Sequence, residues 1–207
     1  VDNGHELASH GMSHMRVTDQ SRAEFADDAG TSKKMLEDLG GCEVTGYRAP
    51  SFSIGEKNIW ALDVLKEAGF KYSSSIYPIR HDHYGMPSAP RFSFHPLQGQ
   101  DFLEMPVTTV EILGHKIPCG GGGYFRLLPY IISKMAMRRV NEKDRRACIF
   151  YFHPWEIDPG QPRQKQAGLK SKFRHYTNLG VMEGKIRTAL SEFQWGRMDE
   201  IFLNGQG

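Results

Sequence analysis

The 207-residue sequence lacks several features that would place it in a class at once. It has only three cysteines, an odd number without CxxC spacing, so neither a disulfide framework nor a cysteine zinc site is expected. No apolar run approaches the roughly 18 residues that a membrane-spanning helix needs. Neither positive nor negative charge dominates, because the sequence has 26 Lys and Arg and 24 Asp and Glu, which gives a net charge of +2. These absences favour a globular domain without a membrane span.

The most basic stretch, residues 138–146, has acidic residues interspersed among its arginines. Such mixing is typical of a solvated helix face, so no nucleic-acid partner is expected. A nucleic-acid binder using this stretch is the competing interpretation, and it predicts binding that falls steeply with salt.

No Pro/Ser-rich linker or low-complexity run divides the sequence, which predicts a single domain over residues 1–207. The use of cysteine suits a reducing compartment, so we expect a cytoplasmic location. Since the chain starts at Val1 and not at methionine, a preceding signal peptide or strand stays open.

Hydrophobic periodicity predicts alternating helices and strands, the pattern of an α/β fold. Thr18 or Asp19 is the expected cap of the first helix. Residues 78–96 are expected to form a long irregular loop with strand fragments. The tail over residues 197–203 fits a strand or a helix. The expected helices cover residues 18–39, 59–68, 124–140 and 177–193. The expected strands cover residues 43–47, 70–75 and 147–152, and residues 103–113 are expected to form a strand or a hairpin arm.

Two histidines near the start, His10 and His14, are four residues apart. On a helical turn this spacing places both imidazoles on one face, within reach of one cation. Neutral imidazole suits zinc and similar divalent metals. Two ordinary surface histidines at this spacing are an equally good interpretation. His5 is a further candidate ligand or a partner of nearby backbone.

Two later residues follow predicted strands. His153 ends an almost wholly apolar run, 147–152, that is typical of a parallel strand buried on both faces. The carboxyl ends of parallel strands are where α/β folds place their active sites. Arg48 also follows a strand, and its guanidinium can hold a carboxylate. A structural histidine and a surface salt bridge are the alternatives.

Together, the segments "SHGMSH", "YRAPSF" and "IFYFHPW" occur in the order of three motifs of the polysaccharide deacetylase family with the NodB-homology domain, which the chain resembles. The segments "HELASHG", "GGGGYFRLLPY" and "HPWEIDP" look more narrowly like the bacterial deacetylases of exopolysaccharide and exosortase gene clusters. The resemblance covers nearly the whole chain. It implies a deformed (β/α)7 barrel and a metal-dependent hydrolase of carbon–nitrogen, non-peptide bonds.

The resemblance also implies roles for individual residues. His10 and His14 would bind one divalent ion, most simply zinc, and His153 would be the general acid that protonates the departing amine. Arg48 would hold the aspartate that serves as general base. The expected partner is an N-acetylated polysaccharide or oligosaccharide. Its groove would be lined by Pro50, Ser51, Phe52, Tyr151 and Trp155.

The sequence departs from the family at its first motif, a pair of aspartates ahead of the histidines. Only nine residues precede His10, and the adjacent pair Asp27 and Asp28 follows the histidines in a predicted helix. We therefore expect the domain to be N-terminally truncated, without its first strand or strands and helix, and inactive as it stands. A carbohydrate-binding relative without catalysis is the alternative. In the fourth motif an acidic residue and tryptophan are replaced by residues 72–75, Tyr-Ser-Ser-Ser.

Overall fold

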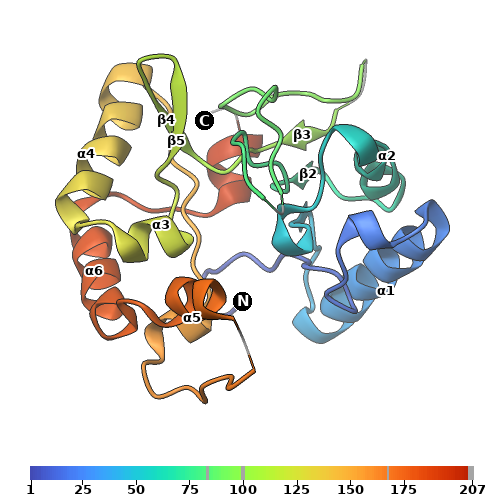
Figure 1. The fold of residues 1–207 in the computed structure, drawn as a ribbon. Helices are drawn as coiled ribbons and strands as arrows, with labels where there is room; N and C mark the ends of the chain where they lie inside the picture. Colours follow the sequence, from blue (N-terminus) through green and yellow to red (C-terminus); the bar gives the residue numbers. More distant parts are fainter. Residues whose placement is uncertain (83, 99–100, 167, 205–207) are drawn as a thin grey trace. The chain divides into compact units, whose positions relative to one another are not determined.

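A computed structural model describes residues 1–82, 84–98, 101–166 and 168–204 (Figure 1). The chain forms two compact units, which we describe in turn. Unit 1 comprises residues 1–107 and the segment from residue 197 onward, and unit 2 comprises residues 108–196. The single domain expected over residues 1–207 stays a prediction.

Unit 1 contains a parallel sheet in the order β1 (Gly46–Tyr47), β2 (Tyr72–Ser73) and β3 (Leu103–Glu104). Gly46 pairs with Tyr72, and Tyr72 pairs with Leu103. Ser9 extends the sheet by a parallel bridge to Tyr47. The strands predicted over residues 43–47 and 70–75 are confirmed in position, although each is only two residues long. The prediction for residues 103–113 is divided, since β3 ends at Glu104 and residues 109–112 form one arm of a hairpin.

Two helices of unit 1 pack together beside the sheet (Figure 1): α1 (Arg22–Gly40) and α2 (Trp60–Glu67). Both helices were predicted. The cap of α1 was predicted wrongly, since Ser21 makes the capping box with Glu24, while Val17–Asp19 form a separate 3-10 turn, η1. The core between these helices and the sheet contains Phe25, Tyr47, Trp60, Leu62, Leu65 and Phe70.

The rest of unit 1 consists of short turns and loops. The described part of residues 78–96 is irregular, as predicted, and pairs with β3 by one antiparallel bridge between Phe94 and Glu104. The remaining elements are the 3-10 turns η2 (Pro50–Phe52) and η3 (Glu56–Asn58) and the π-helical turn η6 (Asp199–Leu203), which makes the tail helical.

Unit 2 begins with a β-hairpin whose turn, at Leu113 and Gly114, has positive φ at both residues. Helices follow and pack around Phe125, Met137, Met182 and Ile186. The elements are β4 (Thr109–Ile112), β5 (His115–Pro118), α3 (Gly122–Leu127), α4 (Tyr130–Arg139), the π-helical turn η4 (Val140–Asp144), the 3-10 turn η5 (Pro154–Ile157), α5 (Leu169–Tyr176) and α6 (Leu179–Glu192).

Two predictions for unit 2 are wrong. The helix expected over residues 124–140 is broken at Pro129, which has an extended ψ of 139° and no N–H for an intrahelical hydrogen bond. The strand expected over residues 147–152 is reduced to one bridge between Tyr151 and Gly121. The chain enters α3 at Gly122, directly after Gly121, so the parallel pairing with Tyr151 cannot continue. Phe152 is 42% exposed, which contradicts burial on both faces.

The α/β class is therefore confirmed. The sheet of the described residues in unit 1 has three strands, and the closed seven-stranded barrel stays a prediction. No helix among the described residues has the length and apolar character to cross a bilayer.

Candidate active site

The two metal-ligand candidates, His10 and His14, lie on an exposed turn that follows the Ser9 bridge. Their ring centroids are 5.0 Å apart in an edge-to-face arrangement. The expectation of a helical turn is wrong, because Gly11 (φ 80°) and His14 (φ 55°) have left-handed backbone conformations. The structure nevertheless brings the two imidazoles together, as the spacing predicted.

The turn is held by Asp28, which projects from α1. One carboxylate oxygen accepts the backbone N–H of Met12 at 2.9 Å. The other accepts the N–H of Ser13 at 2.9 Å and its hydroxyl at 2.5 Å. A Cβ at Gly11 would lie 2.7 Å from the Asp28 carboxylate, so only glycine lets the turn approach the helix this closely. Sequence reasoning missed this role of Asp28.

The His10 ring is oriented by the backbone of Arg48. Its Nδ1 donates a hydrogen bond to the Arg48 carbonyl oxygen at 2.6 Å. Because a carbonyl can only accept, the proton of neutral His10 is on Nδ1 and the lone pair is on Nε2. A backbone carbonyl on the remote nitrogen is the usual partner of a metal-binding histidine.

The guanidinium of Arg48 is half-buried and contacts the end of the neighbouring strand. Nε donates to the Ser74 carbonyl at 3.0 Å, and Nη2 donates to the Ser74 hydroxyl at 2.8 Å. The guanidinium also lies over the Phe52 ring, 5.8 Å from its centroid. These contacts place Arg48 beside the histidine turn at the carboxyl ends of β1 and β2.

The predicted groove residues of unit 1, Pro50, Ser51 and Phe52, form η2 directly after Arg48. Pro50 and Phe52 are buried, whereas Ser51 is exposed. Ser51 and Phe52 have φ values of 57° and 49°, a conformation that costs roughly 1–3 kcal/mol per residue outside glycine. Such strain often occurs at ligand-binding segments, and here it occurs at an exposed residue, Ser51.

A buried carboxyl, Glu104 of β3, supports the same edge of the sheet. Its Oε1 accepts the N–H groups of Ser75 and Ile76 at 2.9 and 2.8 Å. Burial raises the pKa of Glu104, and the N–H hydrogen bonds and the charge of Arg48 only partly oppose this effect. Its one visible signal in the sequence is an acidic residue inside an otherwise apolar strand.

The candidate residues of unit 2 also lie together. His153 precedes η5, and its side chain is 50% exposed. Its ring stacks on Trp155, with centroids 5.4 Å apart, and meets the Tyr151 ring edge-to-face at 5.8 Å. The backbone N–H of His153 donates to the buried Glu156 carboxylate at 3.0 Å. Sequence reasoning had not singled out Glu156.

The donor chemistry of the histidine turn fits a divalent metal in part. His10 and His14 supply two imidazoles, the nitrogen ligands that zinc and similar ions take. Over residues 1–82, 84–98, 101–166 and 168–204, no group of three or more His, Cys, Asp or Glu side chains is arranged to hold a metal. The role of His10 and His14 as metal ligands therefore stays a prediction.

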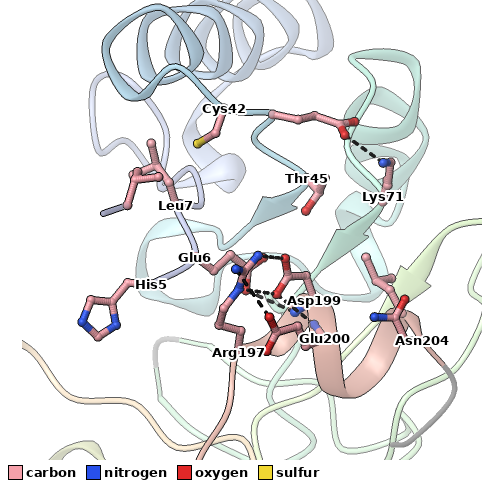
Figure 2. Close-up of a pocket in the computed structure, with 13 residues that line it drawn as sticks. His5, Glu6, Leu7, Cys42, Thr45, Lys71, Arg197, Asp199, Glu200 and Asn204 are labelled. Atoms are coloured by element: carbon pink, nitrogen blue, oxygen red, sulfur yellow. Dashed lines mark hydrogen bonds and ion pairs between the residues drawn. The ribbon is translucent and has the colours of Figure 1, made fainter. Parts of the chain in front are cut away.

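A separate cavity of about 500 Å³ lies at the other ends of the strands of unit 1 (Figure 2). Glu6 borders it and accepts hydrogen bonds from the Tyr72 hydroxyl at 2.6 Å and from the Asp199 N–H at 3.2 Å. Arg197 forms ion pairs with Asp199 and Glu200 there. His5 also lines this cavity, so it is not grouped with His10 and His14.

Two family models together match nearly the whole chain. Residues 1–73 match the model of the family described as "Polysaccharide deacetylase". Residues 74–203, well over half of the chain, match the model described as "Domain of unknown function (DUF3473)". The chain belongs to this second family. A comparison with curated proteins finds no significant match.

Solved structures show the same fold. They include a provisionally named polysaccharide deacetylase from Mycobacterium smegmatis (TM-score 0.52, 19% identity), PuuE allantoinase (0.55, 16%) and a probable polysaccharide deacetylase from Pseudomonas aeruginosa PAO1 (0.55, 17%). Each similarity covers 97% of this chain and 62%, 58% and 59% of the respective structure. The chain thus spans about three fifths of their length.

Proposed function

We propose that this chain is the greater part of a metal-dependent N-deacetylase, which hydrolyses N-acetyl groups of a bacterial exopolysaccharide. The observation that supports it best is the histidine turn, where Asp28 holds the backbone and the Arg48 carbonyl leaves the lone pair of His10 on Nε2. The match of residues 1–73 to the polysaccharide deacetylase family supports the reaction class.

His10 and His14 would hold one divalent ion, most simply zinc. Bound there, such an ion would polarise the acetamide carbonyl and lower the pKa of a water ligand, so that a hydroxide-like nucleophile exists near neutral pH. The backbone N–H of Ser51, an exposed residue, would donate to the oxyanion that forms as the carbonyl is attacked.

The departing amine needs a proton, because an unprotonated amide nitrogen is a poor leaving group. We assign this step to His153, which gives the proton from its ring nitrogen as the C–N bond breaks. Arg48 would orient the carboxylate that serves as general base. The sugar would lie along Pro50, Ser51, Phe52, Tyr151 and Trp155.

The test uses the longest natural polypeptide that contains residues 1–207, with metal content and acetate release from N-acetylglucosamine oligomers as the measurements. His10→Ala should lose both metal and acetate release. His153→Ala should keep the metal and lose at least about 100-fold in kcat, the typical contribution of a general acid.

Two results would argue against the proposal. If the protein binds the oligomer but neither metal nor acetate release is detected, the carbohydrate-binding alternative is correct. If His153→Ala keeps its full rate, the assignment of the acid is wrong, while the metal site stands on the His10→Ala result.

A further inference from the structure

Unit 2 contains an ion pair that is almost completely buried. The side chains of Glu156 and Arg126 are only 1% and 2% exposed, and Oε1 of Glu156 lies 3.2 Å from Nε of Arg126. Taking two charges out of water costs several kcal/mol per ion, so a buried pair is seldom a net source of stability. Stability alone therefore does not explain why this ion pair is buried.

Arg126 is fixed by further hydrogen bonds. Nη1 donates to the carbonyls of His175 and Thr177 at 2.6 and 2.8 Å, and Nη2 donates to the carbonyl of Arg174 at 2.5 Å. With these donors used, the guanidinium has one position, which in turn fixes the Glu156 carboxylate. Arg126 acts as a rigid anchor at the end of α3.

The second oxygen of Glu156 faces His153. Oε2 accepts the backbone N–H of His153 at 3.0 Å and lies 3.2 Å from its Nδ1. Burial alone would raise the pKa of Glu156, but the hydrogen bonds from His153 and the charges of His153 and Arg126 outweigh it, so the pKa is lowered. An ionised carboxylate can only accept, so Nδ1 of His153 carries a proton.

We propose that Glu156, anchored by Arg126, is the positioning residue of His153. It fixes the Nδ1–H tautomer, so that Nε2 is the nitrogen that gains and gives the reacting proton, and its negative charge stabilises the imidazolium. When the C–N bond of the substrate breaks, its electron pair stays on nitrogen and the proton moves there from Nε2. This inference rests on the proposed function, in which His153 is the acid.

A purely structural role is the competing explanation, since Glu156 also completes a capping box at the start of η5. Glu156→Gln separates the two. The one amide oxygen of glutamine can keep both donors of His153, the backbone N–H and Nδ1–H, and with them the capping box. The negative charge beside the ring is lost, so a purely structural role predicts an unchanged rate, whereas a positioning role predicts a fall in kcat.

The experiment records the ¹⁵N resonances of the His153 ring in the natural protein and in Glu156→Gln, together with kcat and KM. We expect the Nδ1–H tautomer of His153 in the natural protein and also in the variant, whose amide oxygen can still accept from Nδ1–H. We also expect kcat to fall at least about 100-fold, with KM changed less than about threefold. Asp158→Asn is the matched control, because Asp158 is an exposed acid of the same segment that accepts the Gly160 N–H at 3.0 Å.

An Nε2–H tautomer in the natural protein would overturn the proposal, even if Glu156→Gln fails to fold. An unchanged kcat in Glu156→Gln, where His153→Ala loses its rate, would also overturn it. If the natural protein shows the Nδ1–H tautomer but His153→Ala keeps its rate, then Glu156 still positions the ring and the failure belongs to the proposed role of His153.

Discussion

Replacing Asp28 with asparagine should weaken the histidine turn and, with it, metal binding. Met12 N–H donates to one oxygen of Asp28, while Ser13 donates twice to the other. In Asp28→Asn, the amide oxygen can keep the two bonds from Ser13. The amide nitrogen then faces the Met12 N–H, donor against donor, and one charge-assisted hydrogen bond is lost.

The size of the effect follows from that bond. A hydrogen bond to a charged group contributes about 1.5–3 kcal/mol when buried, and partial exposure reduces this to about 1–2 kcal/mol. If the loss falls on the conformation that binds metal, the Kd for zinc or cobalt rises about tenfold, because 1.4 kcal/mol corresponds to a factor of ten.

The assay is calorimetric titration of the metal-free protein with zinc, with urea unfolding measured alongside. Asp27→Asn is the matched control, since Asp27 is the exposed neighbour on α1 and its replacement changes the net charge equally. Its effect should stay within about 0.5 kcal/mol. Equal losses of affinity in the two variants would refute the reasoning, because charge and not hydrogen bonding would then account for both.

Three further predictions concern stability and reactivity. Gly11→Ala should lower the free energy of unfolding by at least about 1–2 kcal/mol, because Gly11 has a left-handed φ and lies close to α1. Gly30 lies inside α1 with open space around it, so Gly30→Ala should raise the free energy of unfolding by about 0.5–1 kcal/mol. Urea titration measures both. Burial raises the pKa of Glu104, so its folded form binds the proton more tightly and the stability it contributes is lost as pH rises above 4.5 through the raised value. The melting temperature of Glu104→Gln should therefore rise relative to that of the natural chain as the pH is raised from 4 to 8. A difference between the two melting temperatures that does not change with pH would contradict this. Finally, Cys42 should react with Ellman's reagent at pH 8 far faster than Cys148, since burial raises the pKa of Cys148 to about 12; Cys42→Ser should abolish the fast phase.

Local patterns in the sequence were enough to predict much of the fold. The amphipathic period located α1, α2 and α6, and four-residue spacing brought His10 and His14 together. Other signals were present but underused. The Ser21-x-x-Glu24 box marks the start of α1, and Pro129 marks the break between α3 and α4.

The supporting carboxylates could not be predicted because their partners are distant in sequence. Asp28 holds residues 15 and 16 positions earlier, and Glu104 binds backbone 28 and 29 positions earlier. Arg126 and Glu156 are 30 positions apart. No local period encodes such pairs. The expected strand over residues 147–152 failed for the same reason, since a strand depends on partner backbone elsewhere.

The capping box of α1 has a consequence for how sequences of this kind tolerate change. Each residue of an α-helix advances the chain by about 100° around the helix axis. Because Ser21 and Glu24 fix where the helix starts, they also set the direction in which Asp28 points. One residue added or removed between Ser21 and Asp28 would turn the carboxylate away from the turn it holds. The length of the segment from Ser21 to Asp28 is therefore more constrained than its composition.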